Sequence, residues 1–323
     1  MNYRIEKLGA IKVICKKERV HKPKTGAGTP DITSFWTKCG QDGDYGSVEH
    51  YCFAAGIRMH MWSSKTGNAI MRNMMKNPLI RDFDAICDTG IAKAGFTSGL
   101  CGEWTMDRFS LFADQLGLDV RHITVANQKH TDLIHVAWAE DAGYGTVRPQ
   151  GDDYYDAIIS DWKELALCVH TADCVPVVLL DPDKEAVGIL HSGWKGTAKR
   201  IAGKTVHKMA ETYGTDPGRV ICCMGPYNHS CCYEVGEDVL DEFRSSFSDK
   251  ECEKLFTKKG KNGKFLLDLG EAISMSLCSE GVKRVNIHDS GFCTYHTDEF
   301  SSWRRTYNKK HQILTYIMLM KSL

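Results

Sequence analysis

The clearest pattern along the chain is a series of short apolar runs separated by polar turns, between residues 157 and 191. Four of these runs have the length and composition of strands, at 157–160, 165–170, 175–180 and 186–191. The last two flank Asp181-Pro182-Asp183, which is a typical turn sequence. We therefore predict that they pair as a hairpin.

Helical spacing of apolar residues predicts the remaining large elements. In the longest predicted helix, Ile201, Thr205 and Met209 share one face, and Gly214 follows as a C-cap. The predicted helices are 104–116, 193–212, 237–247 and 267–279, and further strands are expected at 123–126, 133–137, 220–224, 282–287 and 313–320. Because helices and strands mix without regular alternation, the expected class is α+β or a layered α/β sandwich.

The first 80 residues differ from the rest of the chain in charge and pattern. They contain 13 basic and 6 acidic side chains, and residues 20–50 are rich in Gly, Pro, Thr and Asp. We expect a basic, loosely structured N-terminal extension over 1–80 and a folded domain over 81–323. The extension is either a partly mobile arm or a segment that binds nucleic acid or another partner.

Composition excludes several classes of protein. The 323 residues are 42% hydrophobic and 25% charged, with 41 basic and 41 acidic side chains. This balance argues against disorder, a fibre, or a basic footprint for nucleic acid over the whole protein. No apolar run has the ~18 residues of a membrane helix, and no secretory signal is visible, so we expect a cytoplasmic location without a membrane partner. The 14 cysteines include no C-x-x-C pair, which disfavours a zinc ribbon or a thioredoxin-type site.

Nucleotide and serine-hydrolase motifs also lack support. Gly203-Lys204-Thr205 resembles the end of a P-loop, but it lies inside a predicted helix, and Ala198 stands where the motif needs an earlier glycine. No G-x-G-x-x-G follows a strand, and no G-x-S-x-G is present.

The predicted hairpin brings two reactive side chains together. Pairing across the 181–185 turn places Cys174 and His191 at its open end. A thiol and an imidazole in contact form either a nucleophile with its base or two ligands of a metal, and a packed cysteine with a core histidine is the structural alternative. His130, in a polar turn, would complete a Cys-His-His set with the open fourth position of a catalytic zinc site. His170 is a weaker candidate ligand, because it lies further along its strand.

Several segments of the sequence resemble the YfiH/YlmD-like laccase-domain family, first described as multicopper polyphenol oxidases and later as purine nucleoside phosphorylases. The resemblance covers roughly residues 95–320. The matching segments are Asn127-Gln128-Lys129-His130, Thr171-Ala172-Asp173-Cys174, His191-Ser192-Gly193-Trp194-Lys195-Gly196, Gly225-Pro226, Cys232-Tyr233-Glu234-Val235-Gly236, Phe292-Cys293-Thr294-Tyr295 and Ser302-Trp303-Arg304-Arg305.

The resemblance implies a four-layer α/β/β/α sandwich with mixed sheets. It also implies zinc held by His130, Cys174 and His191, with phosphorolysis of adenosine, inosine and 5′-methylthioadenosine and deamination of adenosine as a second activity. Purine nucleosides and phosphate would be the partners. Several positions depart from the family pattern, namely Thr131, Lys195, Asn228 and Thr306.

Other residues are candidates for specific roles in such a reaction. Asp173 would orient a ligand histidine or cap a turn. Glu234 would be a general acid for the purine or begin a helix. Phosphate needs cationic partners, for which the candidates are Arg108, Lys195, Arg304 and Arg305.

Three alternative functions stay open. Cys174 and His191 would also serve a cysteine hydrolase without a metal. Copper-dependent polyphenol oxidation is disfavoured, because its copper centres use His pairs in H-x-H spacing and none occurs among the 13 histidines. A protein that binds without catalysis is the third alternative.

Overall fold

The computed structural model describes residues 80–99, 102–259, 263–308 and 311–321, together with the backbone of four strands nearer the N-terminus. The chain divides into two compact units, residues 1–74 and 75–323. In the first unit, β1 (Tyr3–Leu8) pairs with β2 (Ile11–Lys16), and β3 (His50–Ala54) pairs with β4 (Ile57–Met61), both antiparallel. The expected loose extension over 1–80 otherwise lies outside the described residues.

The second unit contains two large mixed sheets. The five-stranded sheet has the order β5 (Ile80–Asp82), β6 (Ala92–Thr97), β18 (Ile313–Leu319), β10 (Ala166–Thr171) and β7 (Ile123–Val125). The six-stranded sheet has the order β17 (Ile287–Asp289), β13 (Ile221–Met224), β11 (Val175–Asp181), β12 (Ala186–Ser192), β9 (Ala157–Ser160) and β8 (Ile134–Val136). A small third sheet joins β14 (Glu234–Val235), β16 (Lys264–Leu267) and β15 (Phe256–Lys259).

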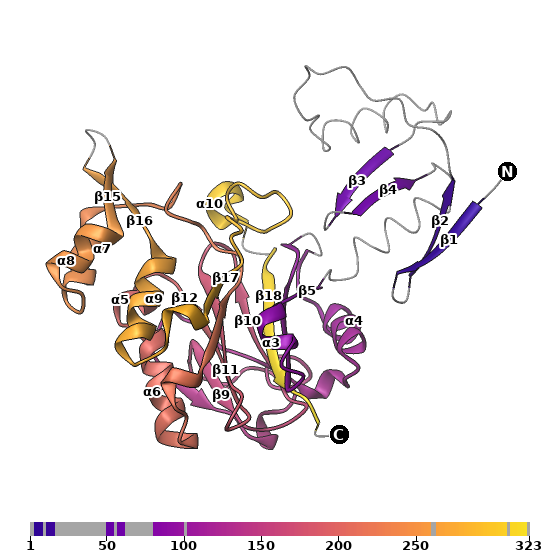
Figure 1. Cartoon of the computed structure of the whole chain (residues 1–323), viewed down its shortest axis with the longest axis horizontal. Coiled ribbons are helices and arrows are strands. Elements are labelled where there is room, and N and C mark those ends of the chain that lie inside the picture. Colours follow the sequence, from indigo (N-terminus) through magenta and orange to yellow (C-terminus); the bar gives the residue numbers. More distant parts are fainter. Residues whose placement is uncertain are drawn as a thin grey trace, which may run out of the picture. The chain divides into compact units, whose positions relative to one another are not determined.

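Helices cover the outer face of each large sheet (Figure 1). The five-stranded sheet is covered by α4 (Met106–Leu116), whose Phe109, Phe112 and Leu116 pack on it. The six-stranded sheet is covered by α5 (Trp194–Ala198), α6 (Ile201–Tyr213) and α9 (Leu269–Ser279), and α7 (Glu237–Arg244) packs against α5. The shorter helices are α3 (Asp84–Cys87), α8 (Asp249–Leu255) and α10 (Trp303–Thr306), with 3-10 turns at Val120–His122, Ala139–Asp141, Pro217–Arg219 and Arg284–Asn286.

Both faces of strand β11 are buried and apolar. Its alternate side chains point to opposite faces of the sheet. Val177 and Leu179 pack against the helices, whereas Val178 and Leu180 fill the space between the two sheets. Burying each such side chain contributes roughly 1.5–3 kcal/mol. The layers are therefore helix, sheet, sheet and helix, which confirms the expected α+β sandwich.

The predicted elements are largely confirmed, with two corrections. The helix expected over 193–212 is interrupted, because Arg200 adopts a left-handed conformation (φ 59°) that ends α5 and precedes α6. The Arg200 guanidinium lies 4.0 Å from the centre of the Phe247 ring. The strand expected over 282–287 is wrong, since residues Arg284–Asn286 form a 3-10 turn and the strand begins at Ile287. Its parallel pairing with β13 fixes that start.

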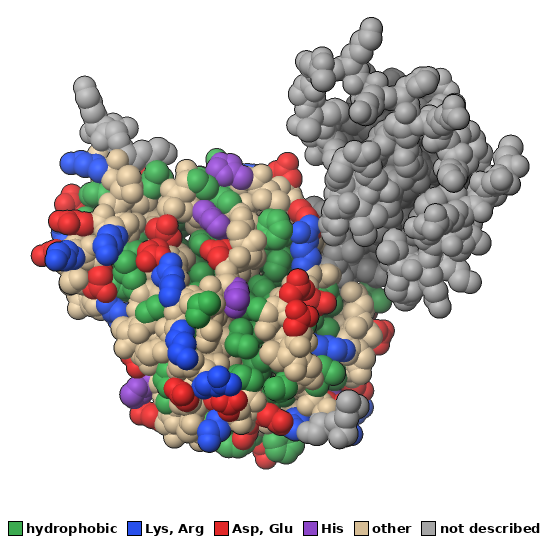
Figure 2. All heavy atoms as spheres, viewed as in Figure 1, with side chains coloured by type: hydrophobic (Ala, Val, Ile, Leu, Met, Phe, Trp, Pro, Cys, Tyr) green, Lys and Arg blue, Asp and Glu red, His purple; other side chains and the backbone are tan. Residues whose placement is uncertain are grey.

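The surface of the second unit carries charges of both signs in a scattered arrangement, which Figure 2 shows on one face. Among the described helices, none combines the length and the apolar character that are needed to cross a bilayer.

Candidate active site

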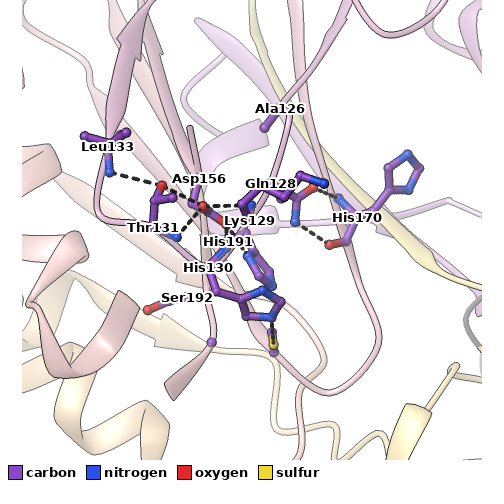
Figure 3. Close-up of polar contacts among 12 residues, drawn as sticks. Ala126, Gln128, Lys129, His130, Thr131, Leu133, Asp156, His170, His191 and Ser192 are labelled. Carbon is purple, nitrogen blue, oxygen red and sulfur yellow. Dashed lines mark hydrogen bonds and ion pairs between the residues drawn. The ribbon is translucent and has the colours of Figure 1, made fainter. Parts of the chain in front are cut away.

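Three side chains from separate elements converge at one end of the six-stranded sheet. His130 lies in the turn after β7, Cys174 directly precedes β11, and His191 is the penultimate residue of β12. The sulfur of Cys174 lies 3.9 Å from Nε2 of His130, and the potential ligand atoms of all three residues lie within 4.8 Å of one another. The two imidazole rings meet edge to face with their centres 4.8 Å apart (Figure 3).

The predicted hairpin accounts for two of these positions. In the register of β11 and β12, Val175 pairs with Ser192 and Pro176 pairs with His191. Cys174 therefore lies just beyond the paired residues, next to His191. The structure confirms this juxtaposition, which follows from the turn at 181–185 alone.

A buried carboxylate, Asp156, connects His191 to the turn that carries His130 (Figure 3). Its Oδ1 lies 2.7 Å from Nδ1 of His191. It also accepts hydrogen bonds from the backbone N–H groups of the turn and from the Thr131 hydroxyl; the donors are Lys129, His130 and Thr131. With Nδ1 of His191 occupied, its Nε2 is the nitrogen available as a ligand.

The sequence reasoning missed Asp156. Asp173, next to Cys174, was the candidate for orienting a histidine or, alternatively, for capping a turn. The available signal was a carboxylate immediately before the strand 157–160, where an apolar residue would be expected. The residue is fully buried, so its charge needs the hydrogen bonds that surround it.

The electrostatics of the site follow from this network. Burial raises the pKa of Asp156, but the His191 contact and the N–H donors outweigh it and lower the pKa to about 2. Burial likewise raises the pKa of the Cys174 thiol, and the charge of His191 with the hydrogen bonds of both histidines lowers it below its ordinary value. Burial lowers the pKa of His191, but the charge of Cys174 and the hydrogen bonds with Cys174 and Asp156 have a larger effect. The pKa of His191 is therefore raised above its ordinary value. The site therefore favours a thiolate beside a protonated or cation-bound imidazole.

A glycine permits the close approach of the three side chains. A Cβ on Gly193 would lie 2.9 Å from the sulfur of Cys174 and 2.9 Å from Cδ2 of His130. Such contacts are shorter than real Cβ atoms allow, so a side chain here would displace a member of the cluster. The next residue begins α5, which carries Lys195.

Asp173 connects the site to the C-terminal loop. Its carboxylate accepts hydrogen bonds from the Thr294 hydroxyl and from the backbone N–H of Arg304, both at 2.7 Å. Its backbone has φ 94°, and its carbonyl accepts a hydrogen bond from Asn228. Asp173 therefore positions the loop that carries Arg304, and the histidine-orienting contact belongs to Asp156.

The two adjacent arginines have different surroundings. The guanidinium of Arg304 lies 4.8 Å from the centre of the Tyr233 ring and donates to the carbonyl of Glu234. The guanidinium of Arg305 donates to backbone carbonyls of its own loop; the acceptors are Thr294, Tyr295, Thr297 and Phe300. Arg305 is thus ordered without a carboxylate at position 306, where the Thr306 hydroxyl bonds to the carbonyl of Ser302.

Lys195 and Arg108, the remaining candidate cations, contact neighbouring residues of their own segments. The ammonium of Lys195 lies 5.5 Å from the centre of the neighbouring Trp194 ring. Arg108 lies on α4, on the outer face of the five-stranded sheet, and donates to the carbonyl of Glu103. The described contacts of Arg108 thus hold it to its own segment of the chain.

His170 points away from the cluster (Figure 3). Its ring packs beside Trp104 at 5.8 Å and Phe109 at 6.1 Å. Burial lowers its pKa to about 4, as expected for a neutral core histidine. His170, the weaker ligand candidate, therefore lies outside the cluster.

Comparisons with known proteins place the chain in a family. The model for multi-copper polyphenol oxidoreductase laccase proteins matches residues 103–320. A purine nucleoside phosphorylase of Bacteroides thetaiotaomicron is 36% identical over 167 residues, which are 51% of this chain and 61% of that protein. Adenosine deaminase RL5, from an unknown prokaryotic organism, is 31% identical over 205 residues, which are 62% of this chain and 76% of that protein.

The fold is shared with a solved structure. The YfiH protein of Bacillus licheniformis superposes with a TM-score of 0.67 and 30% identity, covering 71% of this chain and 93% of that one. The matched segment spans about three fifths of the Bacteroides relative. Because the family model covers most of the second unit, the chain belongs to the multi-copper polyphenol oxidoreductase laccase family.

Proposed function

We propose that the protein is a zinc-dependent purine nucleoside phosphorylase that also deaminates adenosine. The observation that carries this proposal is the open Cys-His-His cluster with its buried Asp156. The two relatives described above, a purine nucleoside phosphorylase and an adenosine deaminase, support the same reaction classes. Adenosine, inosine and 5′-methylthioadenosine are the proposed nucleosides.

The cluster fits a zinc ion. Zinc–sulfur and zinc–nitrogen bonds of about 2.3 and 2.0–2.1 Å allow two ligands of one ion to lie up to roughly 4.4 Å apart. The 3.9 Å between Cys174 Sγ and His130 Nε2 satisfies this limit. A thiolate, two imidazoles and a carboxylate behind one imidazole are the donor set of an open zinc site. When bound, the ion would polarise an oxygen of phosphate or water in the fourth position.

The surrounding residues supply the rest of the proposed mechanism. Phosphate must approach C1′ of the ribose with its charge neutralised. The proposed cations are Lys195, four residues after His191, and Arg304, whose backbone is bound by the residue before Cys174. Asp173 fixes the backbone of Arg304 directly, so the guanidinium starts from a defined position. Tyr233 is buried beneath that guanidinium and offers a flat apolar surface. Glu234 is the proposed proton donor to the leaving purine.

A metal-free cysteine hydrolase is the second candidate, and one observation favours it. Cys174, His191 and Asp156 form a line of nucleophile, base and orienting carboxylate. The two readings differ in metal content, since the hydrolase needs no zinc and its thiol reacts with iodoacetamide in the resting protein.

Copper oxidase chemistry is not favoured, in spite of the family description. A centre with several coppers needs many more His ligands than a single Cys-His-His set. Within the ranges that the structure describes, the groups able to hold an ion are this set and one further group of three cysteines and a histidine. We therefore propose zinc as the metal of the active site.

The decisive experiment uses full-length protein of known metal content. It is incubated with inosine and phosphate, and hypoxanthine and ribose 1-phosphate are quantified; adenosine without phosphate is assayed separately for inosine and ammonia. We expect equal amounts of the two phosphorolysis products. The Cys174→Ala variant should lose both activities and one zinc, whereas Cys278→Ala, at an exposed cysteine elsewhere, should lose neither. Wild-type rates in Cys174→Ala would exclude the zinc mechanism.

A further inference from the structure

Four more side chains with metal-ligating atoms converge outside the Cys-His-His cluster. They are Cys231, Cys232, Cys293 and His296, whose potential ligand atoms all lie within 4.8 Å of one another. The three sulfur–sulfur distances are 3.5, 3.6 and 3.7 Å. The sulfur of Cys231 lies 3.5 Å from Nδ1 of His296.

Two loops bring these residues together across about sixty positions of sequence. Cys231 and Cys232 lie in the loop between β13 and β14, and Cys293 and His296 lie in the loop between β17 and α10. A parallel bridge between Tyr227 and Cys293 fixes one loop against the other. It is formed by hydrogen bonds from Tyr227 N to Phe292 O and from Thr294 N to Tyr227 O, at 3.2 and 2.9 Å.

The spacing of the sulfurs matches a shared ion. A tetrahedral zinc with bonds of about 2.3 Å separates two of its sulfur ligands by roughly 3.7–3.8 Å. The observed distances approach this value, and they far exceed the ~2.05 Å of a disulfide. Four protein ligands also close the coordination sphere, which is the arrangement of structural zinc sites.

A buried amide beside the cluster supports an ionised ligand. Asn228 is fully buried, its Oδ1 lies 3.0 Å from the sulfur of Cys232, and its Nδ2 has no hydrogen-bond partner. The oxygen and nitrogen of such an amide are interchangeable in a structure without visible hydrogens. If the oxygen and nitrogen of Asn228 exchange places, the amide N–H donates a hydrogen bond to the sulfur of Cys232. Metal-bound thiolates accept hydrogen bonds of this kind.

We propose that Cys231, Cys232, Cys293 and His296 bind a second zinc ion, which has a structural role. Soft thiolate ligands with one imidazole select zinc over the hard cations magnesium and calcium. No step of the proposed reaction uses this ion. It would hold the loop between β13 and β14 against the loop between β17 and α10.

The link to the active site runs through Thr294. This residue follows Cys293 and donates its hydroxyl to Asp173, which precedes Cys174 and also holds the backbone of Arg304. Arg305 binds the carbonyl of Thr294 as well. Loss of the second zinc should therefore loosen the position of Arg304 while His130, Cys174 and His191 still bind their own ion.

The test compares the zinc content of full-length variants by elemental analysis after gel filtration. Cys231→Ser is the main variant, because Cys231 is exposed and its replacement leaves the core intact. We expect Cys231→Ser to lose one zinc per chain, Cys174→Ala to lose one, and the double variant to lose two. Cys278→Ser is the matched control at another exposed cysteine and should retain the wild-type content. Differences between variants are compared because further cysteines lie outside the described residues.

A second measurement identifies the ligands. In Cys174→Ala protein loaded with cobalt, we expect strong thiolate-to-cobalt absorption in the near ultraviolet, and Cys231→Ser or His296→Asn in that background should weaken it. Equal zinc content in Cys231→Ser and wild type would overturn the proposal. So would a disulfide among these cysteines in protein purified under reducing conditions, or cobalt absorption that neither substitution alters.

Discussion

Asp156 holds His191 through a hydrogen bond of 2.7 Å to Nδ1, and the same carboxylate accepts the N–H groups of the turn that carries His130. One buried side chain therefore sets the orientation of one proposed ligand and the backbone of another. The relationship makes Asp156 the most informative residue to change in this protein.

Replacing Asp156 with asparagine should weaken zinc binding. Loss of such a carboxylate behind a ligand histidine typically costs roughly 10–100-fold in metal affinity. The measurement is a competition titration with a chromophoric chelator. Asp183→Asn is the matched control, because Asp183 lies in the turn at the other end of the same hairpin and pairs with Arg219 on the surface. Equal affinities in all three proteins would contradict the assigned role.

Acid should destabilise the metal-free protein through the same residue. Folding lowers the pKa of Asp156 from 3.8 to about 2, so its contribution is present above pH 4 and is lost as the pH falls toward 2. The shift corresponds to about 2 kcal/mol of unfolding free energy. Urea titrations of chelator-treated protein between these pH values should show a steeper loss in wild type than in Asp156→Asn. If the unfolding free energies of wild type and Asp156→Asn fall equally with pH, Asp156 is not the source of the acid sensitivity.

Gly193→Ala should disrupt the metal site more than the fold. The added Cβ would meet Cys174 and His130 at 2.9 Å each, and both are proposed ligands. We expect loss of one zinc with little change in the circular dichroism spectrum. Gly151→Ala is the control, since its Cβ would meet only the Tyr144 hydroxyl at 3.5 Å. A Gly193→Ala protein with full zinc content and activity would show that the cluster tolerates the displacement.

Arg304→Ala and Arg305→Ala should have distinguishable effects. A hydrogen bond to a charged group contributes about 1.5–3 kcal/mol, so loss of Arg304 should raise the KM for phosphate by roughly 10–100-fold. Adenosine deamination consumes no phosphate and serves as the internal control. Arg305→Ala should instead lower the melting temperature, because that guanidinium binds several backbone carbonyls of its loop. An unchanged phosphate KM in Arg304→Ala would remove this arginine from the phosphate site.

The boundary of the folded domain can be tested by truncation. A chain starting at residue 75 should keep zinc and nucleoside cleavage, in agreement with the second compact unit. A chain starting at residue 84 lacks β5, which pairs with β6, and lacks the ion pair of 2.6 Å between Arg81 and Glu299. We expect it to melt at a lower temperature. If the chain starting at residue 75 folds but loses zinc, residues 1–74 have a role in the site.

Most elements followed from local patterns of the sequence, and so did half of the site. Two apolar runs on either side of the turn at 181–185 predicted the hairpin, and the pairing of its strands brings Cys174 to His191. His130 entered as a turn histidine and through the family resemblance. The interruption of the helix at Arg200 was not visible in the sequence, because the apolar spacing continues through it and a left-handed arginine has no sequence signature.

Two features depended on the tertiary structure. Asp156 is separated from His191 by 35 residues. A carboxylate just before a strand is unusual, but the sequence does not show which N–H groups and which histidine surround it. The group of Cys231, Cys232, Cys293 and His296 escaped a search for C-x-x-C spacing, because two loops some sixty residues apart supply its ligands. Local sequence determines strands, helices and hairpins through propensity and periodicity. Contacts between distant segments depend on how the two sheets and their loops pack, and packing is decided by the whole chain at once.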